Sequence, residues 1–125
     1  MAKILVVEDE AAVSAFVVRA LTHKGHDVKA VSDGLAALAV LAEEKFDLLL
    51  TDIVMPKLDG IALALKASKE YPAMKILLMT GYSAERQRAH NLAALVHRVI
   101  AKPFTLDEIS AAVEEELGAG RTPPP

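Results

Sequence analysis

Short apolar runs alternate along the chain with longer segments whose apolar residues recur at helical spacing. The apolar runs cover residues 3–7, 27–31, 46–52, 74–79 and 96–101. Helical spacing follows residue 9 up to Gly25, follows Gly34 as far as Lys45, and recurs over residues 59–70, 83–92 and 105–117. Strands that alternate with helices are joined by right-handed crossovers, which build a parallel sheet with helices on both faces. The pattern therefore predicts a three-layer α/β fold.

The most informative stretch is FDLLLTD, residues 46–52. Its three successive leucines predict a strand that is buried on both faces, as in the middle of a parallel sheet, and Met55-Pro56 then ends it. Asp52 therefore stands at the carboxyl end of a central strand, the edge where open α/β sheets bind ligands. For the first and third strands to meet at that edge, the strand order must be 2-1-3-4-5. This is a doubly wound, flavodoxin-like arrangement.

Polar residues also follow three of the other apolar runs. Glu8 and Asp9 follow the first run, Thr80 follows the fourth, and Lys102 follows the fifth. In a parallel sheet these ends share one edge, so we expect them to face Asp52 across one crevice. Clustered carboxylates repel each other unless a hard cation lies among them, and oxygen ligands suit Mg²⁺. Asp52 would then be the nucleophile of a phosphoryl transfer, with Thr80 and Lys102 stabilising the phosphoryl oxygens.

Each of these residues also has a simpler explanation. Glu8 and Asp9 could cap the following helix, because acidic side chains are favourable at a helix N-terminus. Thr80 could be an ordinary strand-end hydroxyl, and Lys102 could be a structural ion-pair partner. The four features together point to a shared site more strongly than any of them alone.

Length and composition exclude several classes of function. A chain of 125 residues has room for one domain, without a second catalytic or DNA-binding module. A net charge of −3 and a pI near 5.8 give no basic surface for nucleic acid, and the absence of cysteine excludes disulfides and thiolate sites. No apolar stretch suits a signal peptide or a membrane span, so we expect a cytoplasmic protein. The histidines lack ligand spacing, and we expect solvent rather than a metal around them: His23, His26, His90 and His97.

In this order, the strand-end motifs resemble those of response-regulator receiver domains. The resemblance covers residues 3–118 and rests on Glu8-Asp9, Asp52 with Met55-Pro56 and Asp59-Gly60, Thr80-Gly81 and Lys102-Pro103-Phe104. It implies that a histidine kinase or a histidine phosphotransferase donates a phosphoryl group to Asp52. It also implies that Mg²⁺ is held by Glu8, Asp9, Asp52 and the backbone carbonyl of Val54, and that the Lys102–Pro103 peptide bond is cis.

The resemblance further implies a signalling module of a two-component system or phosphorelay rather than an enzyme. Its only reactions would be self-directed, Mg²⁺-dependent phosphotransfer and autodephosphorylation. We expect a monomer or weak dimer with its receiver domain at residues 1–118, followed by a flexible, proline-rich tail at residues 119–125.

One position departs from the commoner receiver pattern. Val99 lies three residues before Lys102, where many receivers carry a switching tyrosine or phenylalanine. Together with the single-domain length and the TDIVMP motif, this makes the chain similar to CpdR-type receivers of alphaproteobacterial cell-cycle circuits, which prime a Clp-type protease. The output partner would then belong to a protease-adaptor system. We expect phosphorylation to shift residues 81–95 rather than to flip one aromatic ring.

Other functions fit the sequence less well. Phosphatases and dehalogenases with an aspartate nucleophile resemble each other in a second aspartate two residues later, but this chain has Val54 there. Nucleotide-binding domains carry glycine-rich phosphate loops that are missing here. A receiver-like scaffold that binds partners without phosphorylation stays an open alternative.

Overall fold

The computed structural model describes residues 2–53, 55, 58–80 and 98–118. These residues form a five-stranded parallel sheet in the predicted order, β2-β1-β3-β4-β5. The strands are β1 (Lys3–Val7), β2 (Asp27–Val31), β3 (Leu48–Asp52), β4 (Lys75–Thr80) and β5 (Arg98–Ala101). β3 lies at the centre of the sheet, and Asp52 is its last residue.

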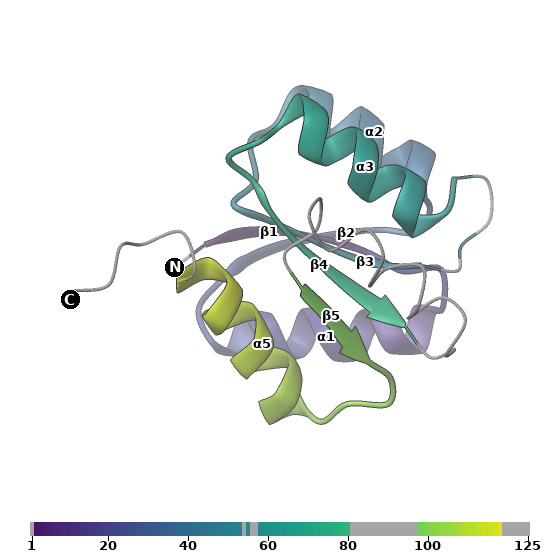
Figure 1. Cartoon of the computed structure of the whole chain (residues 1–125). Coiled ribbons are helices and arrows are strands. Elements are labelled where there is room, and N and C mark those ends of the chain that lie inside the picture. The colour runs from purple at the N-terminus through teal and green to yellow at the C-terminus, as the bar shows by residue number, and fades with distance from the viewer. Residues whose placement is uncertain (1, 54, 56–57, 81–97, 119–125) are drawn as a thin grey trace.

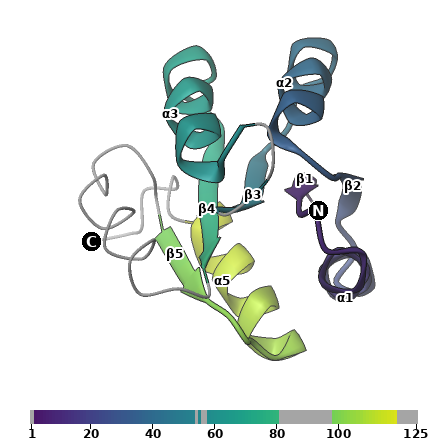
Figure 2. The same ribbon diagram turned by 90° about the vertical axis from the view of Figure 1, so that its right-hand side faces the viewer.

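Helices pack on both faces of the sheet, which confirms the three-layer α/β fold (Figure 1). Their bounds are α1 (Ala11–His23), α2 (Gly34–Glu43), α3 (Gly60–Glu70) and α5 (Leu106–Gly118). Figure 2 shows that α2 and α3 cover one face, whereas α1 and α5 cover the other. The helix predicted over residues 83–92 and the tail at 119–125 lie outside the described residues. No helix in the described part of the chain is long and apolar enough to cross a membrane.

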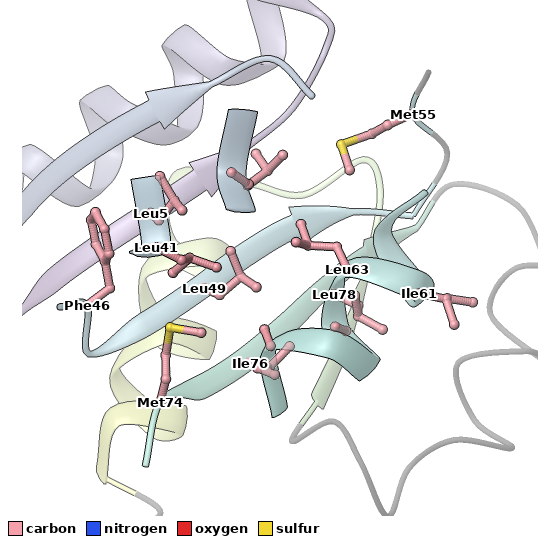
Figure 3. Packing of buried hydrophobic residues seen from close by; sticks show 14 of the residues in the cluster. Leu5, Leu41, Phe46, Leu49, Met55, Ile61, Leu63, Met74, Ile76 and Leu78 are labelled. Carbon is pink, nitrogen blue, oxygen red and sulfur yellow. The ribbon is translucent and has the colours of Figure 1, made fainter. Parts of the chain in front are cut away.

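Side chains of the central strands alternate between two hydrophobic clusters, one under each helical layer. Leu49 belongs to the cluster under α2 and α3, together with Leu5 and Leu78, whose packing Figure 3 shows. Leu48 and Leu50 belong to the cluster under α1 and α5. Because helices cover both faces, the leucine run of β3 is continuous, and all three of its leucines are fully buried. Burial of each leucine contributes roughly 1.5–3 kcal/mol to the stability of the fold. The position of Asp52 at the end of β3 is therefore well fixed.

Capping residues fix where two of the helices begin. The Asp59 carboxylate accepts a hydrogen bond from the backbone N–H of Ala62 at 2.8 Å, at the start of α3. Before α5, the Thr105 N–H donates to Glu108 Oε1 at 2.8 Å, and the Glu108 N–H donates to Thr105 Oγ1 at 3.1 Å. These contacts form a reciprocal capping box. Both helices follow loops at the carboxyl edge of the sheet, so the caps also set the lengths of those loops.

One expectation about the histidines was wrong. His26 is buried, with 8% of its surface exposed, whereas His23 is exposed as expected. The Ala2 N–H donates to His26 Nδ1 at 3.1 Å, and His26 Nε2 lies 2.8 Å from Glu114 Oε1. His26 is thus held by Ala2, just before β1, and by Glu114 on α5, which are segments distant in sequence. His90 and His97 lie outside the described residues.

Candidate functional site

The predicted site residues come together through the register of the parallel sheet. Asp52 at the end of β3 is paired with Met79, so Thr80 stands one residue further along β4. Thr80 is in turn paired with Ala101, the last residue of β5. Glu8 follows β1 directly, beside the end of β3. The strand ends therefore form one edge, as the sequence predicts.

An acidic cluster forms at this edge from Glu8, Asp9 and Asp52. One carboxylate oxygen of each residue lies within 4.8 Å of the others. Glu8 and Asp52 are buried, with 2% and 7% of their surfaces exposed, whereas Asp9 is exposed. The cluster thus has two buried carboxylates and one that opens to solvent.

Helix capping does not account for Glu8. The N-cap residue of α1 is Glu10, and its side chain makes no capping hydrogen bond. Glu8 Oε2 instead accepts a hydrogen bond from the Glu10 N–H at 3.1 Å, while Glu8 Oε1 faces Lys102. The Glu8 carboxylate is therefore held by the loop and by a side chain from the other end of the chain.

Lys102 joins two of the three carboxylates. Its ammonium group donates to Glu8 Oε1 at 2.7 Å and lies 3.2 Å from Asp52 Oδ2. Its backbone N–H donates to the Thr80 carbonyl at 2.7 Å, and the Lys102–Pro103 bond is cis, as the resemblance implies. Lys102 is thus an ion-pair partner, but its partners are the candidate site residues themselves.

Burial and charge act against each other on the ionisation of the site. Burial raises the pKa of the Asp52 carboxyl, and the nearby Lys102 only partly opposes this effect. Burial also raises the pKa of Glu8, against the hydrogen bond from Lys102. For Lys102, burial lowers the pKa, but the hydrogen bond to Glu8 and the two carboxylate charges outweigh it and leave the pKa raised. The cluster thus has three carboxylates and one ammonium group, which pairs with two of them, so the fully ionised site keeps a negative charge that favours a cation.

Two residues of the site region have structural roles that sequence reasoning missed. The Thr51 hydroxyl, fully buried, donates to the carbonyl oxygen of Asp52 at 2.9 Å. The Gly60 N–H donates to the Ile53 carbonyl at 2.8 Å, and a Cβ at Gly60 would overlap the carbonyl oxygen of Asp52. Only glycine lets the start of α3 approach the backbone so closely. A threonine within a leucine run, and a glycine directly after an N-cap aspartate, were the available signals.

The donor set of the cluster fits a hard divalent cation. Mg²⁺ takes oxygen ligands, keeps several waters and needs only one or two carboxylates from the protein. Glu8, Asp9 and Asp52 supply such oxygens within reach of one ion. Val54, whose carbonyl the resemblance adds to this set, lies outside the described residues. Thr80 is buried at the end of β4, beside the backbone of Lys102.

Comparison with known proteins assigns the family. A model of the response regulator receiver domain matches residues 4–114 of this chain. The chain belongs to this family. The receiver is 39% identical over 117 residues to the response regulator receiver protein CpdR of Brucella abortus, covering 94% of this chain and 98% of CpdR. The predicted family, its two-component signalling class and the similarity to CpdR are thereby confirmed.

Two further matches show the settings in which similar domains occur. The receiver is 37% identical over 119 residues to the sensor kinase CckA of Brucella abortus, covering 93% of this chain but 12% of CckA. Among solved structures, TrrA of Thermotoga maritima in complex with Mg²⁺-BeF matches with a TM-score of 0.83 and 29% identity, covering 92% of this chain and 98% of TrrA. Receivers thus occur both as whole chains and as parts of sensor kinases.

Proposed function

We propose that this receiver is a single-domain response regulator that accepts a phosphoryl group on Asp52 in a Mg²⁺-dependent reaction. The observation that carries the proposal is the position of Asp52. It is a buried carboxylate at the end of the central strand, 3.2 Å from Lys102 and within 4.8 Å of two further carboxylates. A nucleophilic carboxylate needs such neighbours, because negative charge spreads over the phosphoryl oxygens during transfer.

The two oxygens of Asp52 have different surroundings. Oδ1 accepts a hydrogen bond from the Ile53 N–H at 2.9 Å, while Oδ2 faces Lys102. An Asp52 oxygen would attack the phosphorus of a phosphohistidine as the phosphorus–nitrogen bond breaks, and the imidazole nitrogen would keep the electron pair. Lys102 and the Thr80 hydroxyl would then contact the phosphoryl oxygens. Water would later hydrolyse the acyl phosphate in the expected autodephosphorylation.

Mg²⁺ is the proposed cofactor, held by Glu8, Asp9, Asp52 and the Val54 carbonyl. When bound, it would neutralise charge on the phosphoryl group and orient it toward Asp52. The all-oxygen donor set supports this assignment, as does the relative TrrA, which was solved in complex with Mg²⁺-BeF. Lys102 would give up part of its contact with Glu8 as the cation enters.

The proposed phosphodonor is a histidine kinase or a histidine phosphotransferase. An apolar hollow of about 310 Å³ lies next to Lys102, between the start of α1 and the loop before α5. Phe16 and Phe104 contribute to it, with ring centroids 6.3 Å apart, and Phe16 is 37% exposed. An apolar helix face of the donor could bind there and bring its phosphohistidine to Asp52.

The proposal also covers the output, which is the protein on which the receiver acts. The high coverage of CpdR supports a CpdR-like role, in which the receiver acts on a protease-adaptor system. Val99 is half-buried against the cluster under α2 and α3, so a switch in this region would work without an aromatic ring at this position. The domain bounds of 1–118, the monomeric or weakly dimeric state and the cytoplasmic location stay predictions of the same proposal.

Labelling with a small phosphodonor tests the acceptor directly. Incubation with acetyl phosphate and Mg²⁺, followed by mass spectrometry, should place one phosphoryl group on Asp52. Asp52→Asn should abolish labelling, whereas Asp107→Asn, a control at an exposed aspartate on α5, should retain it. Label on Asp9 or Asp59 would refute the assignment. No label on any residue, with normal partner binding, would favour the phosphorylation-independent scaffold.

A further inference from the structure

A groove runs along the edge of the sheet opposite the acidic cluster, where the strands begin. It consists of two adjoining hollows of about 570 Å³ and 320 Å³. The larger is lined by residues 41–47 and 70–74, which connect α2 to β3 and α3 to β4. The smaller reaches the end of α5 at Leu117 and Gly118. Asp47 and Ala73 line both hollows, so together they form one continuous surface, named here the amino-edge groove.

The larger hollow has a lining of both apolar and charged residues. Leu41, Phe46, Tyr71 and Met74 contribute the apolar part, and the charged residues are Glu43, Glu44, Lys45, Asp47 and Glu70. In Figure 3, Leu41, Phe46 and Met74 lie together at one end of their cluster, away from Met55. A hollow of this volume is within the usual range of roughly 300–1,000 Å³ for ligand pockets. Its lining favours an apolar segment with flat rings or a rigid backbone.

The smaller hollow is polar and carries excess negative charge. Asp47 and Glu114 line it, against Lys75 as the opposing cation, and the buried His26 lies beside Glu114. The Glu114 side chain is 56% exposed, so its carboxylate stays open to a further partner. A cationic group would be favoured here.

The chain that leaves α5 matches this groove in the same order. After Gly118, which itself lines the polar hollow, the sequence continues Ala-Gly-Arg-Thr and then three prolines, residues 119–125. Arg121 would therefore reach the acidic hollow first, and Pro123–Pro125 would reach the aromatic hollow beyond it. An extended polyproline segment spans about 3.1 Å per residue, so seven residues cover about 20 Å.

We propose that residues 119–125 bind in the amino-edge groove of their own chain, with Arg121 at Asp47 and Glu114 and the prolines against the half-buried Tyr71. Proline-rich segments bind aromatic grooves well because little conformational entropy is lost. The tether adds a local concentration in the millimolar range, so a contact with a millimolar dissociation constant is about half occupied. Bound in this way, the tail links the end of α5 to the loops that follow α2 and α3.

Paramagnetic labelling tests this contact in the full chain. Because the chain has no cysteine, Thr122→Cys gives a single site for a spin label. Backbone amides of residues 42–47 and 70–74, apart from Pro72, should broaden, while those around Asp52, at the opposite edge, should not. The matched control carries Thr122→Cys with serine at all three prolines, and in it this broadening should fall severalfold. Arg121→Ala should reduce it in the same direction.

Three outcomes would overturn the proposal. Broadening that stays near Gly118, or that is equal with and without the prolines, would show that the tail does not occupy the groove. Broadening that appears between spin-labelled and isotope-labelled molecules mixed together would assign the groove to the tail of a second copy instead. Amide spectra of the unlabelled variants check that each is folded, so that loss of broadening reports the contact.

Discussion

Replacing the phosphoacceptor candidate by its neutral isostere should stabilise the metal-free receiver. In Asp52→Asn, the amide oxygen can still accept the hydrogen bond that Asp52 Oδ1 accepts from the Ile53 N–H. Lys102 loses a carboxylate at 3.2 Å but keeps its shorter hydrogen bond to Glu8 at 2.7 Å. The substitution thus removes a buried charge without leaving Lys102 unpaired.

The distances set the size of the opposing charge interactions, and desolvation adds to them. At an effective dielectric constant of about 20, charges 4.8 Å apart repel by about 3.5 kcal/mol, which is the least that Glu8 and Asp52 should experience. The attraction lost between Asp52 and Lys102 at 3.2 Å is about 5 kcal/mol on the same scale. The substitution also removes the repulsion between Asp52 and the solvent-exposed Asp9, which reduces the difference between the attraction lost and the repulsion removed. The desolvation cost of ionised Asp52, which the substitution removes, then decides the sign, and we expect a gain of about 1–2 kcal/mol at neutral pH.

The effect should depend on pH in a defined direction. Burial raises the pKa of folded Asp52 above its ordinary value of 3.8. Between the two values the folded state binds more protons than the unfolded state, so wild-type stability falls as pH rises through this window. The asparagine of the Asp52→Asn variant cannot titrate. The advantage of the variant should therefore be absent below the ordinary value, grow through the window, and be constant above the raised pKa.

Thermal and urea unfolding with EDTA measure this difference. A gain of 1–2 kcal/mol corresponds to about 3–8 °C in Tm for a domain of this size. The same concentration of Mg²⁺ should stabilise the wild type more than Asp52→Asn, which keeps only two of the three carboxylates, since tighter binding gives more stabilisation. Asp107→Asn, at an exposed position, serves as a control and should change stability by less than about 0.5 kcal/mol. The reasoning would be refuted if Asp52→Asn were less stable than the wild type at neutral pH and had the same pH profile. The Asp52 carboxylate would then not be destabilised by burial and by the neighbouring carboxylates.

Three further predictions concern the same site and its output. Asp9→Asn should lower Mg²⁺ affinity, measured by calorimetry, and raise the Tm without metal; unchanged values of both would show that Asp9 does not share the cluster. Lys102→Ala should bind Mg²⁺ more tightly, because a competing cation is removed, yet be labelled more slowly by acetyl phosphate; weaker Mg²⁺ binding would contradict the Glu8–Lys102 competition. Addition of the beryllofluoride mimic should shift backbone amides across residues 81–101 in NMR spectra, and shifts confined to the metal pocket would count against the proposed output region.

The fold, and the meeting of the candidate site residues at one edge of the sheet, could be predicted from short sequence signals and the topology of parallel sheets. Three leucines before an aspartate and a turn are enough to place Asp52 at the end of a buried strand, and the topology of parallel sheets brings Glu8 and Lys102 to the same edge. The shorter contact of Lys102 with Glu8 than with Asp52 could not be predicted. This difference in distance depends on how far the ends of β1 and β3 extend relative to each other along the sheet, which is set by the strand register.

His26 illustrates the opposite case. Between Gly25 and Asp27 it has the sequence context of a solvated turn, and nothing nearby in the chain indicates burial. Its surroundings come from Ala2, just before β1, and from Glu114 on α5, which is 88 residues away in sequence. The role of Thr51 was missed for a related reason. Its hydroxyl donates a hydrogen bond to the backbone carbonyl of the next residue, and no sequence spacing predicts that contact.

The close approach of Gly60 to Asp52 has a consequence for genetics. Any side chain at Gly60 must displace the carbonyl oxygen of Asp52, so a change eight positions away shifts the backbone of the proposed acceptor itself. A saturation screen for lost signalling should therefore recover nearly every substitution at this codon, with a profile as intolerant as that of Asp52. Variants at Gly60 and variants at Asp52 would differ in whether a second mutation can restore signalling. Second-site suppressors that reshape the intervening loop could restore a Gly60 variant, whereas none could replace a missing carboxylate.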